Sequence, residues 1–536
     1  MGESIMSFMS RFTRHDIYFP AAIALVVVVL GSLPYVYGYA STPPDYEFMG
    51  FIGRDTPGAN SYLAFAQQAA NGQMGLTNLY TPDSPSQGYY NLEWGIMGWT
   101  ARWTGCSLIT LFHVGRVVSA VAFVFAAWYL CLVCLAGRGQ RRGALLLISF
   151  GAGLGWIPYG SNALFGTHLA LPLDAQGVSI FAYLVNKPHF IRAGVFAALQ
   201  YAWFIRGTQR DDLRYFALAG LAAAAHSIIR PYQIPESCLF LLLYGALTVW
   251  QEPARGRRVL LQLGVCAGAH LPAILWHGII YIQNPLGLGA FVAWQPVLLL
   301  SQLLWLGIPF CAVLAAGAWG LTKRSLNLGA IPVLAIWLVV AQVLLQCYPY
   351  FPWGVESYFP WVLAPPLLFV RYVWPARAPR VLLVAMIVLV IPCNVLHYGK
   401  FFNDLRHPDA PWVYYLHNHV GDAMTQLSRF GDEGDVVLAS HDTSQFVPRL
   451  AGLRVVAGQD ALSVDYEENN ALVLRFFQSP GDVGFKEWFV RTRNIDFVFV
   501  GPFEQAVAPQ ELGEIPWLAP VYSNDLVTIY RTELPE

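Results

Sequence analysis

Long apolar runs alternate with short polar connections over the first 400 residues of the chain. Most of these runs are close to about 20 residues, the length that an α-helix needs to cross the hydrocarbon core of a bilayer. They lie at residues 17–39, 107–135, 143–160, 189–206, 215–231, 236–250, 259–282, 294–320, 328–347, 358–374 and 381–397. The pattern predicts a polytopic α-helical membrane protein with about 11 spans.

From about Pro408 onward the pattern becomes that of a water-soluble fold. Segments typical of short strands lie at residues 435–440, 453–458, 495–502 and 526–532, and segments typical of amphipathic helices lie at 465–478 and 483–493. Strands that alternate with helices indicate an α/β domain. We therefore expect a transmembrane domain at residues 1–400 and a soluble α/β domain at residues 401–536.

The composition supports a membrane protein and excludes several function classes. The chain is 56% hydrophobic and only 12% charged, whereas a soluble domain is about 25% charged. With a net charge of −1, the chain lacks the excess of positive charge that is typical of nucleic-acid-binding proteins. The eight cysteines lie mostly in apolar runs, which favours packing over redox or zinc chemistry. The absence of nucleotide-binding motifs leaves a nucleotide-driven pump without support.

Lysine and arginine gather in alternate connections between the predicted spans. The basic clusters are Arg11/Arg14, Arg138/Arg141/Arg142, Arg206/Arg210/Arg214, Arg255/Arg257/Arg258, Lys323/Arg324 and Arg371/Arg377/Arg380. The positive-inside rule assigns these connections and the N-terminus to the cytoplasm. An odd number of spans then places the C-terminal domain on the outer side, together with a long loop at residues 40–106 and the connections at 161–188 and 347–361.

The first outer loop carries four charged residues within a short stretch: Asp45, Glu47, Arg54 and Asp55. A carboxylate at the outer membrane surface can act as a general base on an acceptor hydroxyl or amine, and Asp55 is the first candidate. The alternative is a helix cap, because D-T-P-G is also a normal helix start signal. Asp45 and Glu47 remain rival acids.

A helix is predicted after Pro57, in P-G-A-N-S-Y-L-A-F-A-Q-Q-A-A-N-G-Q, with Gly72 at its end. Its apolar residues recur at helical spacing; they are Tyr62, Phe65, Ala66 and Ala69. We expect this helix to lie along the membrane interface rather than to cross the membrane. Tyr62 is also a candidate substrate contact.

Two polar groups interrupt the later apolar spans. One is Lys187, His189 and Arg192 in N-K-P-H-F-I-R, and the other is His226, Arg230, Tyr232 and Glu236 in A-H-S-I-I-R-P-Y-Q-I-P-E. Charged residues inside apolar stretches are costly and usually face a cavity, and Arg and Lys neutralise phosphate. The pattern therefore predicts a cationic phosphate pocket. The alternative is that Lys187 and Arg192 extend to lipid headgroups.

A single carboxylate, Glu356, lies among aromatic residues in P-W-G-V-E-S-Y-F-P-W. Tryptophan and tyrosine at this depth fit an aromatic belt at the membrane interface. The same rings also suit stacking on a sugar. Glu356 is therefore either a substrate contact or an incidental acid in an interface loop.

Together these features resemble the GT-C superfamily of integral-membrane glycosyltransferases, of the protein O-mannosyltransferase and aminoarabinose-transferase type. The local matches are G-R-D-T-P-G-A-N-S-Y-L-A, G-L-G-W, N-K-P-H-F, and a C-terminal module with P-R-L-A-G-L-R-V-V-A-G and I-D-F-V-F-V-G-P-F-E. The resemblance implies transfer of a sugar from a polyprenyl-phosphate carrier to a glycan, lipid or protein acceptor. It also implies a bacterial inner (plasma) membrane location, with the N-terminus cytoplasmic and the C-terminal domain extracytoplasmic.

The family's acid in the first outer loop corresponds to Asp55, as general base. Many relatives have Asp-Glu as adjacent acids at this place, whereas Asp55 is followed by Thr56. The departure leaves open which acid is catalytic and whether a divalent metal takes part; no other cofactor is implied.

Two other function classes fit parts of the pattern. A transporter or flippase for a lipid-linked sugar also has proline-broken spans with buried charge, but it predicts acids near the bilayer midplane. If the protein is a non-catalytic assembly subunit, substitution of Asp55 should have no effect on its function, whereas substitutions in the C-terminal module should impair it.

Overall fold

The computed structural model describes residues 14–52, 56–82, 92–151, 156, 187–231, 233–283, 330–347, 359–372, 380–406, 414–460, 462–479, 481–507 and 515–534. The chain divides into two compact units. The helical unit falls within Met1–Pro34, His113–His277 and Ala293–Phe402, and the loop–sheet unit falls within Tyr35–Phe112, Gly278–Val292 and Asn403–Glu536. The first loop thus belongs to the same unit as the C-terminal residues. The predicted domain boundary at residue 400 stays a prediction.

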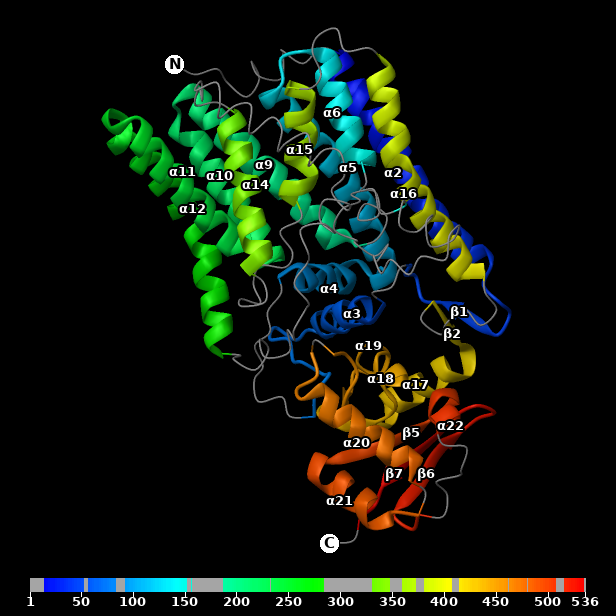
Figure 1. Ribbon diagram of the computed structural model, residues 1–536. Helices are drawn as coiled ribbons and strands as arrows, with labels where there is room; N and C mark the ends of the chain where they lie inside the picture. Colours follow the sequence, from blue (N-terminus) through cyan, green and yellow to red (C-terminus); the bar gives the residue numbers. More distant parts are fainter. Residues whose placement is uncertain are drawn as a thin grey trace. The chain divides into compact units, whose positions relative to one another are not determined.

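The helical unit is built from long apolar helices (Figure 1). They are α2 (Arg14–Ala40), α5 (Leu108–Cys134), α6 (Arg138–Phe150), α9 (Pro188–Arg210), α10 (Leu213–Ile229), α11 (Gln233–Gln251), the short 3₁₀-helix η1 (Pro253–Arg255), α12 (Gly256–Gln283), α14 (Ala330–Cys347), α15 (Phe359–Tyr372) and α16 (Arg380–Arg406). Except for η1 and α16, all of these helices contribute buried side chains to one continuous apolar core. A glycine permits the closest helix approach, since a Cβ on Gly220 of α10 would lie 2.2 Å from the carbonyl oxygen of Cys266 in α12.

Four helices within the described residues are long and apolar enough to cross a membrane: Ile17–Ala40, Leu108–Cys134, Gln233–Gln251 and Pro253–Ile280. Shorter apolar helices lie at Leu213–Ile229, Pro332–Ala341 and Val362–Arg371. The protein is therefore a helical membrane protein. The predicted span 294–320 lies outside the described residues, and the span 143–160 lies largely beyond them after residue 151.

The loop–sheet unit contains a two-stranded ribbon and a five-stranded sheet. The ribbon pairs β1 (Tyr46–Phe48) with β2 (Tyr415–His417), and the sheet has the order β4 (Arg454–Val455), β3 (Val436–Leu438), β5 (Ile495–Val500), β7 (Thr528–Thr532), β6 (Leu518–Ser523). β4, β3 and β5 are parallel, whereas β7 and β6 are antiparallel. The helices are α3 (Thr56–Ala70), α4 (Leu92–Thr104), α17 (Asn418–Phe430), α18 (His441–Ser444), α19 (Val447–Leu450), α20 (Tyr466–Gln478), α21 (Val483–Arg493) and α22 (Pro502–Val507). All four predicted strands and both predicted helices coincide with elements of this unit.

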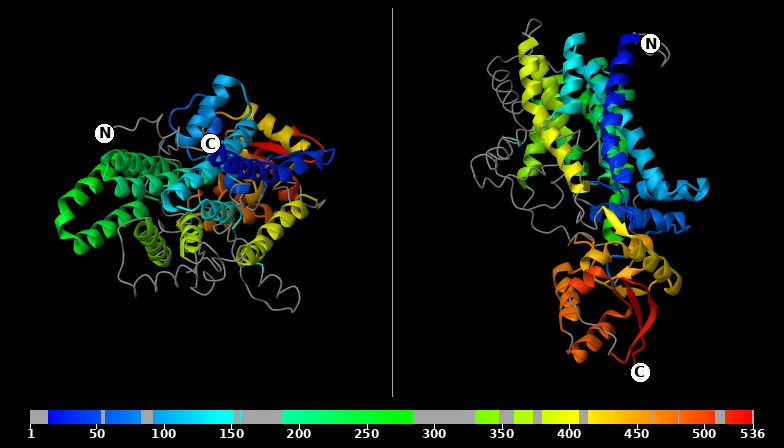
Figure 2. Two further views of the ribbon diagram at one scale, coloured as in Figure 1. Left: turned by 90° about the horizontal axis from the view of Figure 1, so that it is seen from above. Right: turned by 90° about the vertical axis from the view of Figure 1, so that its right-hand side faces the viewer.

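Strand periodicity makes the sheet the middle of three layers. Side chains alternate between faces along a strand, so Val498 of β5 packs with α20 and α21, whereas Phe497 and Phe499 face the opposite core. Ile495 belongs to the same core as Val498, and a register shift interrupts the pairing of β3 with β5 beside it. Buried residues of α17 and α19 belong to that opposite core. Figure 2 shows α20 and α21 along one side of the sheet.

The loop helix α3 is covered on both sides. Phe65 and Ala69 form a core with Trp94 of α4, and Tyr62 stacks on Trp94 with ring centroids 4.6 Å apart. Leu63 and its neighbours on the other face join the core beneath the sheet. The helix was therefore predicted in the correct place, and Gly72 follows its end with a φ of +99°. Protein covers the apolar face of this helix, and the expectation that the helix lies along the membrane interface stays a prediction.

A buried carboxylate joins the loops that follow β3 and β5. Glu504 accepts hydrogen bonds from the amides of Ser440 (2.8 Å) and Gly501 (2.9 Å). Glu504→Ala leaves these buried donors without a partner, which costs about 3 kcal/mol. We expect amide exchange in β3 and β5 of the full-length protein to rise accordingly. Glu487→Ala, which removes a surface pair with Arg491, is the matched control, and an equal effect of both variants would contradict this account.

Candidate functional site

The start of α9 places two of the predicted basic residues inside the helical unit. Pro188 occupies the first helical turn, where its missing amide hydrogen costs nothing. Lys187 is the N-cap and His189 follows the proline. Lys187 is only 2% exposed and His189 7%. The two side chains are therefore inside the protein rather than at lipid headgroups. Arg192, one turn further on, is partly buried, and its Nη2 faces Gly115 of α5.

A proline break places the third basic residue. α10 ends at Ile229 because the residue before Pro231 avoids the helical conformation, and Arg230 has φ −138° and ψ 94°. The Arg230 amide still donates to the carbonyl of His226 (2.9 Å), and its own carbonyl accepts from the amide of Gln233 at the start of α11 (3.1 Å). Arg230 is 2% exposed, and His226 is buried beside it.

These residues converge on two aromatic rings. The Nζ of Lys187 lies 5.1 Å from the centroid of Phe190, and the guanidinium carbon of Arg230 lies 4.4 Å from the same centroid. Arg230 also contacts Phe359, at 5.9 Å, and the His226 ring meets Phe359 edge-on at 5.7 Å. We call Lys187, His189, His226 and Arg230 the cationic cluster. The structure brings together four side chains from two separate sequence motifs, and a phosphate pocket at this cluster stays a prediction.

Cation–π contacts with Phe190 and Phe359 stabilise the charged forms of Lys187 and Arg230. Lys187 and Arg230 repel one another in this low-dielectric environment. An anion bound between them would be attracted by both and by the positive end of the α9 dipole. The cluster is chemically suited to a phosphate.

A buried carboxylate lies next to this cluster in the sequence, where it was predicted only as one of the polar residues around the proline break. Glu236, in the first turn of α11 and 1% exposed, accepts hydrogen bonds from Trp337 Nε1 of α14 (2.6 Å) and the Tyr201 hydroxyl of α9 (3.3 Å). The Tyr201 and Trp337 rings stack at 3.6 Å. Glu236 therefore connects three helices, α9, α11 and α14.

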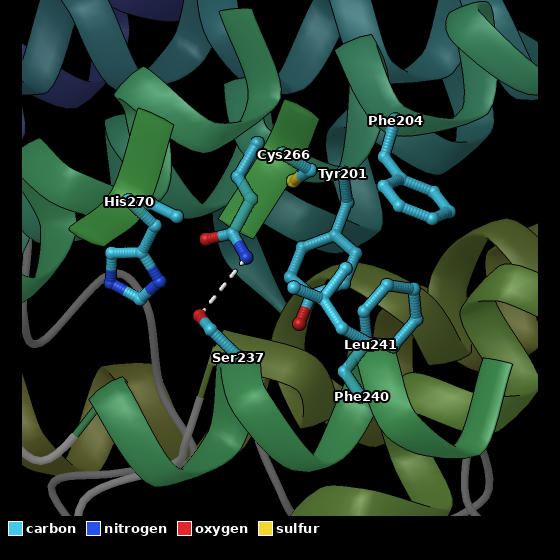
Figure 3. A pocket seen from close by; sticks show the side chains of 9 residues that line it. Tyr201, Phe204, Ser237, Phe240, Leu241, Cys266 and His270 are labelled. Carbon is cyan, nitrogen blue, oxygen red and sulfur yellow. Dashed lines mark hydrogen bonds between the residues drawn. The ribbon is translucent and has the colours of Figure 1, made fainter. Parts of the chain in front are cut away.

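Figure 3 shows a small cavity beside this connection, with Tyr201, Ser237, Phe240 and His270 directed toward it. Gln200 Nε2 donates to Ser237 Oγ across 3.1 Å. Nearby, His270 Nε2 and Ser227 Oγ are 2.8 Å apart. The cavity has room for about one water molecule. It is too small for a sugar or a lipid phosphate and serves packing of the bundle.

The acids of the first loop lie in the loop–sheet unit. Asp45 and Glu47 are exposed at the β1–β2 ribbon, where the Asp45 carbonyl accepts from the amide of Asn418 (2.9 Å). Tyr62 is stacked on Trp94. Four predicted site residues lie outside the described residues: Arg54, Asp55, Tyr232 and Glu356. The substrate roles of all these residues stay predictions.

Sequence reasoning also missed an arginine of the C-terminal half. Arg449 of α19 donates through Nη1 to the Asn60 Oδ1 of α3 (2.8 Å). Burial lowers the pKa of Arg449 to about 10, opposed by the nearby Glu47 carboxylate. Among the described residues, no group of three or more His, Cys, Asp or Glu gathers as ligands for a metal ion.

The comparison with known proteins rests on structure. No family model and no curated protein sequence matches the chain. The Archaeoglobus fulgidus oligosaccharyltransferase in complex with zinc and sulfate has a TM-score of 0.51 and 14% identity, over 95% of this chain and 73% of that one. The archaeal oligosaccharyltransferase AglB of the same organism, in complex with an inhibitory peptide and a dolichol-phosphate, has a TM-score of 0.52 and 13% identity, over 98% and 75%.

A third structure, the arabinofuranosyltransferase AftD from Mycobacteria, has a TM-score of 0.55 and 15% identity. The match covers 98% of this chain and 42% of AftD. The chain has the GT-C glycosyltransferase fold. The resemblance predicted from the sequence is thereby confirmed. At these identities the likeness to the GT-C structures concerns the fold and transfers no residue roles.

The Glu236 connection predicts a graded effect on stability. Glu236→Ala leaves the Trp337 indole N–H without its acceptor inside the bundle, at a cost of about 1–3 kcal/mol. Glu236→Gln keeps an acceptor oxygen, so we expect it to retain most of the stability. Thermal unfolding of the full-length protein in detergent measures the difference. Equal midpoints for the two variants would show that the hydrogen bonds do not matter.

Proposed function

We propose that the protein transfers a sugar from a polyprenyl-phosphate carrier to an acceptor at the outer face of the membrane. The observation that carries this proposal is the convergence of Lys187 and Arg230 on Phe190 inside a bundle of apolar helices. A phosphate attached to a lipid tail has the matching chemistry, an anionic head and an apolar chain. The GT-C glycosyltransferase fold supports the assignment, and one structural neighbour was solved with a dolichol-phosphate.

In this mechanism the cationic cluster stabilises the departing carrier. Negative charge on the polyprenyl phosphate grows as the bond to the sugar breaks. Preorganised cations favour that charge in the transition state. Arg230 and Lys187 supply the charge, the start of α9 adds its dipole, and His189, Arg192 and His226 donate further hydrogen bonds. Tyr232 and Glu356 are proposed as additional substrate contacts.

The acceptor is activated by a carboxylate of the first loop. We propose Asp55 as the general base that removes a proton from the acceptor hydroxyl or amine. Arg54 and Tyr62 would orient the acceptor or the sugar. Asp45 and Glu47 are the rival acids, both exposed at the ribbon.

The proposed location is the plasma membrane, the inner membrane of a bacterium. About 11 spans, with a cytoplasmic N-terminus, place the C-terminal α/β domain and the first loop outside. Helices of the right length and hydropathy support the membrane location. Lipid-linked donor and acceptor would then meet at the outer surface.

Removal of the cluster's arginine tests donor binding. Arg230→Ala eliminates charge-assisted hydrogen bonds that contribute about 1.5–3 kcal/mol, so we expect roughly 10- to 100-fold weaker binding of undecaprenyl phosphate. Arg214→Ala, an exposed arginine paired with Asp212, is the matched control and should bind normally. Binding is measured on purified protein in detergent. Undiminished binding by a correctly folded Arg230→Ala protein would refute the phosphate site.

Replacement of the candidate base tests catalysis. Asp55→Asn removes the proton acceptor and keeps the shape, so we expect loss of sugar transfer from a carrier-lipid donor with expression and folding intact. Asp45→Asn and Glu47→Gln are the parallel variants. If Asp55→Asn is fully active, Asp55 is not the base, and loss of transfer in one of the parallel variants would assign the role to that acid.

A further inference from the structure

A group of polar side chains lies at the carboxyl edge of the parallel strands in the loop–sheet unit, and the proposed mechanism does not use it. His441 follows β3 at the start of α18, and Tyr466 follows β4 at the start of α20 (Figure 1). The chain passes from β3 to β4 on one side and then to β5 on the other side of β3. Open α/β sheets bind ligands outside the carboxyl ends of their strands at such a reversal. The group therefore lies where the topology favours a ligand.

His441 is the centre of this group. Gln445 Nε2 lies 2.9 Å from His441 Nε2, and the Tyr466 hydroxyl lies 3.0 Å from His441 Nδ1. An amide nitrogen can only donate, so His441 Nε2 accepts and His441 Nδ1 carries the hydrogen. The Nδ1–H then donates to the Tyr466 oxygen. The hydroxyl hydrogen of Tyr466 is thereby left to donate to another group.

The other end of this chain of hydrogen bonds offers an acceptor. Gln445 is only 2% exposed, and its Oε1 has no hydrogen-bond partner among the described residues. Because Nε2 of the same amide bonds to His441, this Oε1 lies within the group. A buried carbonyl oxygen without a donor is costly. A hydroxyl group both donates and accepts, so a ligand with several hydroxyls matches Gln445 Oε1 and the Tyr466 hydroxyl together.

The charge around this group disfavours an anionic ligand. Burial, together with the nearby carboxylates of Asp460, Glu467 and Asp442, raises the pKa of Tyr466 to about 12. Asp460 and Glu467 are exposed at the surface. The backbone amides that directly follow β3 and β5 at this edge already donate to Glu504. Carboxylates repel a phosphate or an acidic sugar, whereas they accept hydrogen bonds from hydroxyls.

We propose that His441, Gln445, Tyr466 and the surrounding carboxylates form a binding site for an uncharged sugar unit of the acceptor. The Tyr466 hydroxyl donates to one hydroxyl of the sugar, and Gln445 Oε1 accepts from another. The carboxylates accept from hydroxyls at the rim of the site. This assignment rests on the proposed function, because it identifies the acceptor of the transfer as a glycan. It also gives the C-terminal part of the chain a role in acceptor recognition.

The binding experiment applies full-length wild type, Tyr466→Phe and Gln445→Met to an array of uncharged, amine-bearing and acidic oligosaccharides. Wild type should bind uncharged glycans and reject acidic ones. Each variant loses one hydrogen bond to the sugar, so its Kd should rise about 2- to 10-fold. The thermal midpoint of Gln445→Met should not fall, because this variant also removes a buried oxygen without a partner. Tyr522→Phe, whose hydroxyl accepts from Asn524 at the far edge of the sheet, is the matched control and should bind like wild type.

The kinetic experiment uses the best-bound glycan of the array as acceptor. Tyr466→Phe and Gln445→Met should raise the KM for this glycan about 2- to 10-fold, whereas kcat and the KM for the carrier-lipid donor should change less than about twofold. A double variant with Asp460→Asn and Glu467→Gln removes two of the repelling charges. It should bind acidic glycans that wild type rejects.

A wild-type protein that binds no glycan, or only acidic ones, would overturn the proposed site. Weaker binding that always accompanies a lower thermal midpoint would show a structural role and overturn it as well. Failure of the proposed function has a different signature. Glycan binding by a protein that transfers no sugar would refute the transferase and the acceptor role, and would leave a carbohydrate-binding site. Transfer by a protein that binds no uncharged glycan would refute this site alone.

Discussion

A charge inside an apolar bundle has to be compensated by groups within that bundle, and this constraint organises the helical unit. Arg230 and Lys187 are stabilised by the rings of Phe190 and Phe359, and Glu236 is stabilised by hydrogen-bond donors from two other helices. Removal of any of these partners would leave a costly buried group. The arrangement of α9, α10, α11, α14 and α15 therefore follows from where the ionisable residues lie.

A different constraint organises the loop–sheet unit: side chains on one face recur every two residues along its strands and about every 3.6 residues along its helices. Alternate residues of β3 and β5 fill two cores, and α3 from the first loop completes one of them. On the other face of α3, Gly98 lets α4 pack closely, since a Cβ there would lie 2.2 Å from the carbonyl oxygen of Ala66. The described part of the first loop and the sheet thus share one apolar core. A change of packing at the sheet therefore acts directly on α3.

Local signals made the elements predictable, and the absence of local signals explains what was missed. Short segments rich in valine, isoleucine and phenylalanine predicted β3, β4, β5 and β7, and prolines located the starts or ends of α3, α9 and α10. The burial of α3 was missed because an apolar stripe does not say what covers it. The β1–β2 ribbon and Arg449 were missed because their partners are distant in the chain. α17 was predictable, since Val420, Ala423, Met424 and Leu427 recur at helical spacing.

The pairing of β1 with β2 has a consequence for the order of events during synthesis. Ser41 and Tyr415, whose hydroxyls are 3.2 Å apart at this ribbon, are 374 positions apart in the chain. A ribosome that adds about 5–20 residues per second needs roughly 20–75 seconds to cover that interval. During this time α4 can already cover one face of α3, but the residues of α3 that join the sheet core, such as Leu63, have no sheet to pack on. One face of this early helix therefore waits for residues that are made near the end of synthesis.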